Sequence, residues 1–540
     1  MKKPIELSDV HSLISVTDPR ISPDEKSIIF VQKKMDEEEN TYNAQLFQMD
    51  LESGQQLQWT SGKKQVSSPR WSGDGKNVAF LSYQDGKNQL YSLSISDKKI
   101  YALMDGEQNI DRFEWAACGT KIWINGFLRK NKELFQKKYP EQTSCDNNRQ
   151  IGLIDCETKN IELVLSGGAN YQLEAVSHSG KKVVYGLCTA SLATQVLYVY
   201  DIDTKQHIQV SSEQGCYFGA AFSRDDSKIA FTGSNRRYGN ATHTELYIAD
   251  LQAQTSFCLT ESIDVPVGDF AKSDIQRADA PAVVWTIDDH LYFRVSTMGD
   301  VRLYFASLEG MIFPASPDME HVYSYDVSKD GSFAVLAISN SLQPGELYRL
   351  SITTGEMRPL TSFNQLFIRN TKLANTQSTI TTNAKNSVHG WLTEPIGRQK
   401  KQKYPLIIKV QESSQDMNTN TFSLELQLLA NEGLGVFYAN PSGSHGYSQE
   451  FANAKNEDAQ EDWINAIEEI IQATNWIDVR RIAIVGSNDA QLLMVKLKSK
   501  MIKARFIFLF ESSQPVLFSS SSDFYITQLQ KLLESINKQL

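Results

Sequence analysis

The 540-residue sequence lacks several features that define broad classes of protein. It contains no run of about 18 apolar residues, so it predicts no membrane-spanning helix. The first residues, Met1 to Glu6, carry positive charge but are followed by no apolar segment, which excludes a typical signal peptide. We therefore expect a cytoplasmic protein that does not act in a membrane.

Clusters of basic residues are also scarce. The net charge is −10, and nucleic-acid binding needs gathered Lys and Arg side chains. Two short basic clusters occur, at 398–403 and 496–503, and we predict an exposed loop for the first and one face of a helix for the second. We expect no nucleic-acid partner.

The cysteines show no pattern of a metal or disulfide site. There is no C-x-x-C pair and no histidine at zinc-finger spacing from a cysteine. We expect no metal and no cofactor, and we predict reduced thiols in or near packed strands at Cys118, Cys145, Cys156, Cys188, Cys216 and Cys258.

The sequence instead contains an internal repeat over its first two thirds. Each copy has a turn similar to Ser-x-Asp-Gly, then Lys, then a short apolar strand. The clearest copies occupy 19–30 and 69–80, and weaker copies begin near Phe113, Leu173, Gly219, Val283 and Tyr323. Most copies are followed by a strand with Leu-Tyr or a similar pair, at Leu46, Leu90, Ile151, Leu197, Leu246, Leu303 and Leu347.

The size of the repeat indicates the architecture. Units of roughly 40 to 65 residues are the size of propeller blades. A single four-stranded blade cannot bury both of its faces, so blades stack in a ring. Seven copies predict an all-β seven-bladed β-propeller over residues 1–365. The alternative, an array of β-sandwiches, fits the repeat spacing and the paired phrases less well.

From about Phe367 onward, strands alternate with helices, which is typical of an α/β domain. We predict this second domain over residues 366–540. It contains a β-hairpin at 379–382 and 387–394, strands at 405–410, 434–439, 481–485 and 505–510, and helices at 422–430, 458–474, 489–500 and 527–536.

Three segments carry a resemblance to a known family: 16–24, 403–408 and 438–447, the last reading Tyr-Ala-Asn-Pro-Ser-Gly-Ser-His-Gly-Tyr. With the propeller repeat, they resemble the prolyl oligopeptidase family of serine peptidases, most closely its acylaminoacyl-peptidase-like branch. The resemblance covers most of the chain. It implies a seven-bladed propeller that gates an α/β-hydrolase, which cleaves short peptides through a Ser-Asp-His triad.

The nucleophile that the resemblance implies is not found. Such hydrolases place it in a G-x-S-x-G turn between a strand and a helix, here directly after 482–485. The residue aligned with the nucleophile is Asn488, and an amide cannot be activated to attack a carbonyl. Ser487 stands one position before the expected nucleophile. The residues two positions from it are Val485 and Asp489 rather than glycines, and we favour a role for Ser487 as a helix cap.

The oxyanion loop departs from the family pattern as well. That pattern is His-Gly-Gly-Pro, whose glycines let backbone N–H groups approach the oxyanion. This chain has Gln411, Glu412, Ser413 and Ser414 instead. The carboxylate of Glu412 would oppose a developing negative charge, and the side chains would block close approach.

The remaining triad members should follow the nucleophile in the chain. The last histidine is His445, and Asp523 is the only aspartate after the elbow helix. We therefore expect a truncated α/β-hydrolase without the acid, the histidine and two strands of the family. For His445 itself we weigh a contact in the substrate cleft against a structural hydrogen bond that holds its loop, and we favour the second because Ser442 stands where this branch often has Arg.

Three functional hypotheses follow. The first is a catalytically inactive homologue that binds peptides or a protein through the propeller. The second is a residual peptidase that uses Ser487, with His445 as a partner. The third is a subunit that forms mixed oligomers with an active paralogue. The strand at 506–510 would also be left at an open sheet edge, which predicts either a less stable last third or a dimer contact there.

Overall fold

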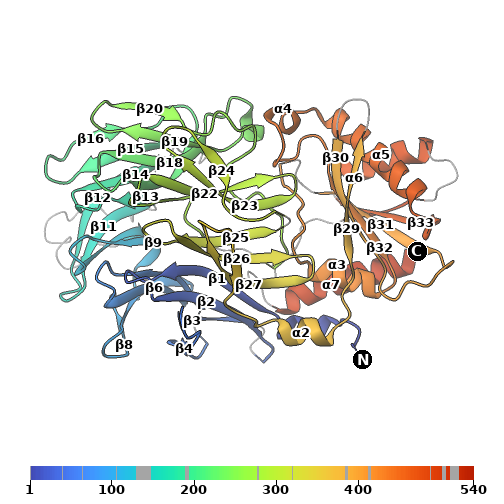
Figure 1. Cartoon of the computed structure of the whole chain (residues 1–540), viewed down its shortest axis with the longest axis horizontal. Coiled ribbons are helices and arrows are strands. Elements are labelled where there is room, and N and C mark those ends of the chain that lie inside the picture. Colours follow the sequence, from blue (N-terminus) through green and yellow to red (C-terminus); the bar gives the residue numbers. More distant parts are fainter. Residues whose placement is uncertain are drawn as a thin grey trace, which may run out of the picture.

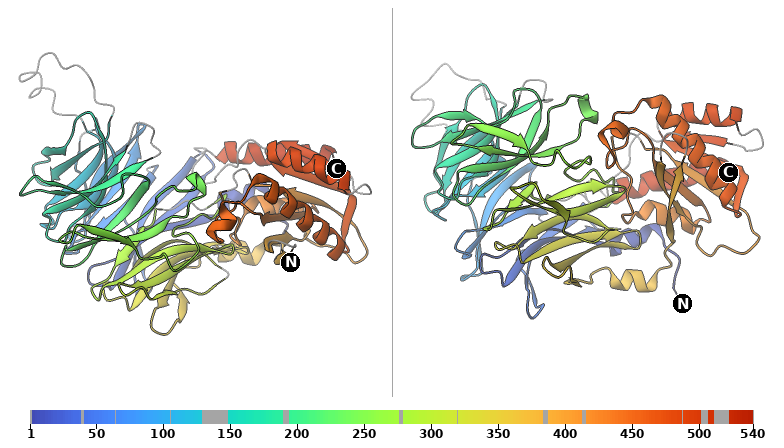
Figure 2. Two further views of the ribbon diagram at one scale, coloured as in Figure 1. Left: turned by 90° about the horizontal axis from the view of Figure 1, so that it is seen from above. Right: turned by 45° about the horizontal axis from the view of Figure 1, so that its top comes forward.

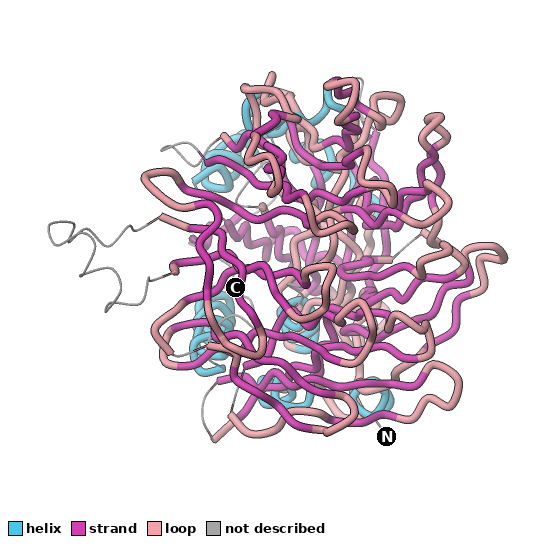
Figure 3. The backbone as a smooth tube through the Cα atoms, turned by 90° about the vertical axis from the view of Figure 1, so that its left-hand side faces the viewer, coloured by secondary structure: helices cyan, strands magenta, loops and turns pink. Residues whose placement is uncertain are grey.

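The computed structural model describes residues 2–38, 41–63, 65–104, 106–128, 148–188, 194–275, 279–318, 320–382, 387–411, 415–486, 488–500, 506–510 and 522–539. A strand-rich body and an α/β body lie at opposite ends of the long axis (Figure 1, Figure 2). Viewed from the strand-rich side, strands and the loops that join them lie in front, and the helices lie behind (Figure 3).

The strand-rich body consists of seven antiparallel meanders of four strands each. The first two are β1 (Ile14–Ile21), β2 (Ser27–Asp36), β3 (Thr41–Asp50) and β4 (Gln56–Gln58), then β5 (Gln65–Trp71), β6 (Asn77–Gln84), β7 (Lys87–Ser94) and β8 (Lys99–Ala102). The third and fourth are β9 (Asn109–Trp115), β10 (Lys121–Phe127), β11 (Gln150–Asp155) and β12 (Ile161–Leu165), then β13 (Asn170–Val176), β14 (Lys182–Cys188), β15 (Gln195–Asp201) and β16 (His207–Gln209).

The last three meanders complete the predicted seven blades. They are β17 (Cys216–Phe222), β18 (Lys228–Ser234), β19 (Glu245–Asp250) and β20 (Thr255–Cys258), then β21 (Val283–Trp285), β22 (His290–Thr297), β23 (Asp300–Ser307) and β24 (Ile312–Pro314), and finally β25 (His321–Val327), β26 (Phe333–Asn340), β27 (Gln343–Ser351) and β28 (Met357–Pro359).

The repeat has the same structural meaning in five of the described blades. A Ser-x-Asp or Thr-x-Asp turn joins the first strand to the second there, beginning at Ser22, Ser72, Ser223, Thr286 and Ser328. Its hydroxyl donates to the carboxylate two residues later, with Ser72 Oγ 2.7 Å from Asp74 Oδ1 and Ser223 Oγ 2.7 Å from Asp225 Oδ1. These bonds stabilise the charged carboxylate, and the hydroxyl of Ser223 is the main reason that the pKa of Asp225 falls to about 2.

The second repeated phrase lies in the third strand of each meander. Its first residue is completely buried in every blade, at Leu46, Leu90, Ile151, Leu197, Leu246, Leu303 and Leu347. In five blades the backbone N–H of this residue also donates to a hydroxyl beyond the fourth strand, as in Leu246 N to Thr260 Oγ1 at 3.0 Å. Sequence reasoning found the buried leucines but missed these hydroxyls.

The first and last blades meet through Asn364, whose side chain is completely buried. Its Oδ1 accepts from Ile14 N at 3.0 Å, and its Nδ2 donates to Ile14 O at 2.8 Å and to Gly345 O at 3.1 Å. Next to it, the Tyr323 hydroxyl of β25 donates to Val16 O of β1 at 2.8 Å. These bonds join β1 to the seventh blade and close the propeller.

The α/β body follows α2 (Gln365–Asn370) and contains one six-stranded sheet. In chain order its elements are β29 (Thr376–Thr382), β30 (Ser387–Thr393), β31 (Tyr404–Lys409), α3 (Leu424–Asn431), β32 (Gly435–Asn440), α4 (Gln449–Ala452), α5 (Asn456–Ala473), β33 (Ile477–Gly486), α6 (Asn488–Lys500), β34 (Phe506–Phe510) and α7 (Ser522–Gln539). The strand order is β29-β30-β32-β31-β33-β34, and the last four of these strands are mutually parallel.

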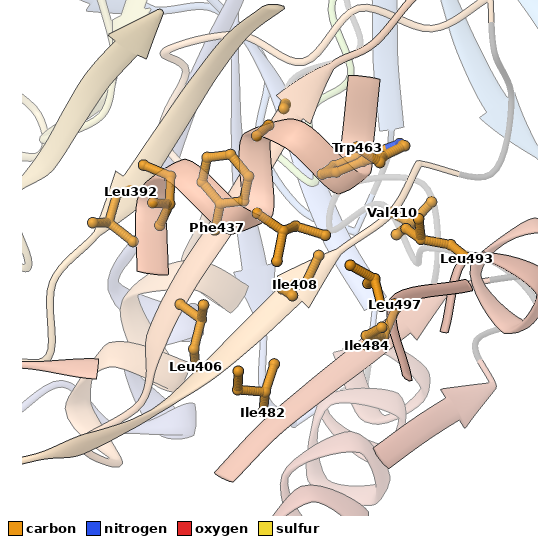
Figure 4. Close-up of a cluster of buried hydrophobic side chains, with 14 of the residues drawn as sticks. Leu392, Leu406, Ile408, Val410, Phe437, Trp463, Ile482, Ile484, Leu493 and Leu497 are labelled. Atoms are coloured by element: carbon orange, nitrogen blue, oxygen red, sulfur yellow. The ribbon is translucent and has the colours of Figure 1, made fainter. Parts of the chain in front are cut away.

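Alternate side chains of the parallel strands face two different layers of helices. Ile408 and Ile484 pack with Trp463 of α5 and Leu493 of α6 (Figure 4). Ile407 and Val485 pack on the other face with α3 and with Ile536 of α7. The predicted α/β domain is therefore confirmed as a two-sided sheet.

All four predicted helices of this body are present, but their boundaries differ from the prediction by up to five residues. The third helix begins at Leu424 rather than Phe422, because Ser423 caps it and Phe422 packs against Phe367, with 6.1 Å between the ring centroids. The last helix begins at Ser522, five residues before the predicted start. The predicted domain boundary at 365–366 coincides with the start of α2 and stays a prediction.

Two further findings concern predicted absences. Among the described helices, none combines the length and the apolar character needed to cross a bilayer. Five of the six cysteines are free thiols, and Cys145 lies outside the described residues.

The closure contact yields a first prediction. Asn364→Ala removes three hydrogen bonds to buried backbone groups and should lower the free energy of unfolding by about 2–4 kcal/mol. Urea denaturation measures this change, with Asn160→Ala at an exposed position as the matched control, expected to stay within about 0.5 kcal/mol of the unchanged protein. Equal stabilities of the two variants would contradict this account of closure.

Candidate functional site

The junction between β33 and α6 is where the resemblance places the nucleophile. β33 ends at Gly486 and α6 begins at Asn488, so a strand and a helix flank the predicted turn. β33 lies between β31 and β34 in the sheet, and the turn therefore stands at the carboxyl edge of the parallel strands. Ser487 lies outside the described residues, as does the side chain of Asn488.

Small residues allow this turn to pack closely. A Cβ atom on Gly486 would lie 2.9 Å from Val410 O and 2.9 Å from the Cβ of Ala490. Ala490 is completely buried, so the position that replaces the second elbow glycine holds a methyl group without spare room. Val410 N donates to Val485 O at 2.9 Å, which fixes the start of the Gln411 loop beside the turn.

Gln411 is held by the neighbouring loops. Its Nε2 donates to Ser444 Oγ at 2.9 Å, and its Oε1 accepts from Asn418 Nδ2 at 3.0 Å. Glu412, Ser413 and Ser414, the rest of the predicted oxyanion loop, lie outside the described residues. The amide of Gln411 therefore serves as a link between loops.

The chain after this loop is fastened to the propeller. Met417 N donates to Phe270 O at 3.0 Å, and Lys272 N donates to Met417 O at 3.0 Å. These backbone bonds make a bridge between the propeller segment 270–272 and the segment that leads into α3.

The family-like loop 440–447 is rigidly bonded. Asn440 Oδ1 accepts from Asn418 N at 2.7 Å, and Asn440 Nδ2 donates to Asn418 O at 2.9 Å. Ser442 N and Oγ both donate to the carboxylate of Asp462 in α5. The loop is thus tied to the sheet edge and to a helix, and Gln411 joins it to the nucleophile turn.

His445 is only 2% exposed. Its ring lies against Phe270 at 4.5 Å and near His243 at 5.8 Å, measured between ring centroids. Burial lowers the pKa of His445, while the carbonyl of Asn240 and the charge of Asp416 act in the opposite direction. His445 is thus buried between the two bodies, and its role in holding loop 440–447 stays a prediction.

The side chain of Asp523 lies outside the described residues. Asp523 is the second residue of α7, a helix that packs on the sheet through Leu532, Leu533 and Ile536. Within the described ranges, no group of three or more His, Cys, Asp or Glu side chains could hold a metal ion.

Sequence reasoning missed the residues that join the two bodies. The tip of the β22–β23 hairpin inserts beside β30: Met298 N donates to Gly446 O at 2.8 Å, and a Cβ on Gly299 would lie 2.3 Å from the Trp391 ring.

A propeller carboxylate also caps α3. Asp274 accepts from Ser423 Oγ at 2.9 Å and from Glu425 N at 3.2 Å, where the helix terminus favours negative charge. The residues joined by Asp274 are separated by 149 and 151 positions, so no local sequence signal could have revealed them.

Comparisons with known proteins agree with this arrangement. A family model described as "Prolyl oligopeptidase family" matches residues 420–488, which end at the first residue of α6. An uncharacterized peptidase of Bacillus subtilis (strain 168), YuxL, is 27% identical over 519 residues, which cover 90% of this chain and 79% of the relative.

Solved structures match over both bodies. Acylaminoacyl peptidase of Pyrococcus horikoshii has a TM-score of 0.72 at 20% identity. The match covers 91% of this chain and 76% of the Pyrococcus chain. An acylaminoacyl peptidase in complex with Z-Gly-Gly-Phe-chloromethyl ketone has a TM-score of 0.77 at 17% identity. The match covers 99% of this chain and 97% of that peptidase. The fold is thus a β-propeller joined to an α/β-hydrolase. The chain is thus similar to the prolyl oligopeptidase family, in residues 420–488 by the family model and over most of its length by the relative from Bacillus subtilis.

The packing of the turn yields a second prediction. Gly486→Ala forces the added methyl group against Val410 O and Ala490, so it should destabilise the α/β body by about 1–3 kcal/mol. Thermal unfolding followed by circular dichroism measures the effect. Gly73→Ala is the control, because its added Cβ meets nothing within 4 Å. A melting curve of Gly486→Ala equal to that of Gly73→Ala would show that the turn is loosely packed.

Proposed function

We propose that this chain is a catalytically inactive homologue of the prolyl oligopeptidase-type serine peptidases, which acts as a binding or scaffold protein through its propeller. The observation that carries the proposal is the β33–α6 junction, where the strand ends at Gly486 and Asn488 is the first residue of the helix. A strand and a helix flank the expected elbow, and the residue aligned with the nucleophile bears an amide that cannot form an acyl-enzyme.

The neighbouring loop supports the same conclusion. Oxyanion stabilisation requires N–H donors that are free to point at the substrate oxygen. The loop begins with Gln411 in place of the histidine of the family pattern, and the side-chain amide of Gln411 is bonded to Ser444 and Asn418. Loss of a triad member alone lowers the rate of such enzymes by several orders of magnitude.

The propeller retains what a scaffold needs. Its inner strands are cross-linked between blades by charged groups: Asp18 contacts Arg70 at 3.1 Å, and the buried Glu174 accepts from Arg112 at 3.3 Å and from Gly219 N at 2.8 Å. Such bonds between neighbouring blades keep their loop faces in fixed positions, as a surface for peptides or a protein partner requires.

A residual serine peptidase is the second candidate. Ser487 lies in the chain directly between the end of β33 and the start of α6, so a hydroxyl does occur at the turn. The imidazole of His445 is an unfavourable base for it, because it is buried against Phe270.

A labelling experiment separates the two candidates. The purified chain and Ser487→Ala are treated with a fluorophosphonate, which reacts with activated serines, and the labelled peptides are identified by mass spectrometry. We expect no labelled peptide that contains Ser487 and no hydrolysis of blocked amino-acid or short-peptide chromogenic substrates. An active acylaminoacyl peptidase serves as the positive control.

Labelling at Ser487, together with substrate turnover that is lost in Ser487→Ala, would establish the residual peptidase and refute the inactive homologue.

A further inference from the structure

Three histidines lie at the boundary between the propeller and the α/β body: His243 of the propeller, and His389 and His445 of the α/β body. We call them the histidine clasp. His243 is 5% exposed and His445 is 2% exposed, while His389 is partly buried. None of them was part of the catalytic machinery that the family resemblance implies.

Each clasp histidine has a buried ring nitrogen without a hydrogen-bond partner among the described residues. These atoms are Nε2 of His243, Nδ1 of His389 and Nδ1 of His445. A neutral imidazole tolerates this, because the bare nitrogen carries no proton. A protonated imidazole would place an unsatisfied N–H and a positive charge in the same buried position.

The clasp histidines also make the contacts that join the two bodies. The ring of His445 faces the carbonyl of Asn240, and the ring of His389 faces the carbonyl of Met298. Beside them, His243 N donates to Gln449 Oε1 at 2.8 Å, and Gln449 Nε2 donates to Ala241 O at 2.8 Å. The hairpin tip at Met298 is thus held from both sides by residues of the α/β body.

We propose that the histidine clasp is an acid-sensitive contact, which holds the α/β body against the propeller while its imidazoles are neutral and releases that body when they gain protons.

The charges around the clasp allow this response. Asp264 Oδ1 lies 4.0 Å from His243 Nδ1, but the Asp264 side chain is 65% exposed and therefore screened. Asp416 faces His445 but is also 3.7 Å from Lys272 Nζ. Asp300 follows the hairpin tip and faces Tyr447.

A fourth buried histidine at the same boundary, His321, is bonded differently. It is 2% exposed, yet Nε2 lies 3.2 Å from Asp269 Oδ2 and Nδ1 lies 3.1 Å from Thr421 Oγ1. Both of its ring nitrogens have partners, and one partner is a carboxylate. The clasp histidines lack this arrangement.

The direction of the pH effect follows from burial. Burial lowers the pKa of all three clasp histidines, and that of His243 falls to about 4. In a released state their pKa would return to about 6.5. The clasp is therefore complete above pH 6.5 and weakens as the pH falls toward 4. The equilibrium constant that favours the held state over the released state falls by up to about tenfold per pH unit for each histidine.

Small-angle X-ray scattering of the full chain between pH 7.5 and 4.5 tests the proposal. We expect the radius of gyration to rise below pH 6.5, while far-UV circular dichroism still shows intact secondary structure. The triple variant His243→Phe, His389→Gln, His445→Gln cannot gain these protons and should stay compact over this range. His207→Gln, on an outer propeller strand beside Tyr185, is the matched control and should expand as the unchanged protein does.

A constant radius of the unchanged protein, expansion of the triple variant at the same pH, or global unfolding in place of release would each overturn the proposal. Should the triple variant not fold, NMR titration of the imidazoles in the unchanged protein decides. Three resonances that titrate together with the expansion support the clasp, and titration without expansion refutes it.

Discussion

The hydrogen bonds of Asn364 are the contact on which the rest of the structure depends. A ring of meanders is stable only when its first and last members bury each other, and Asn364 joins β1 to the seventh blade where the chain leaves the propeller. The same point starts α2, and Phe367 then packs with Ile5, Val10 and Phe422 in one core. Closure of the propeller therefore also fixes the position from which the α/β body begins. The capped helix α3 and the inserted hairpin tip at Met298 build on that position.

The features that could be predicted from the sequence are those set by local chemistry. A turn such as Ser72 to Lys76 bonds within itself, and Leu246 must be buried whichever blade lies beside it. Blades, strands and helices followed from such patterns, as did the turn between β33 and α6. The closure at Asn364, the cap from Asp274 and the link between Gln411 and Ser444 could not be predicted, because each joins groups that only the folded chain brings together. The helix start at Leu424 was missed for the same reason, since Phe422 serves a distant core.

The packing of the site does not depend on which residue occupies the nucleophile position. The nucleophile turn depends on close packing of Gly486 against Val410 and Ala490, which is a requirement of the sheet and its helix rather than of catalysis. Loop 440–447 is likewise held by Asn418 and Asp462, whatever residue stands at 488. These contacts hold the architecture in place without a contribution from the nucleophile position, where Asn488 stands. The inactive homologue that we propose needs only this independence of packing from chemistry.

Active-site titration with 4-nitrophenyl acetate tests the central claim most directly. A serine hydrolase of this architecture forms an acyl-enzyme and releases a rapid burst of 4-nitrophenol before steady turnover. Our account predicts no burst from this chain above that of the Ser487→Ala variant. A burst of about one equivalent per chain that disappears in Ser487→Ala would show that the turn after β33 still carries a working nucleophile, and would contradict the account.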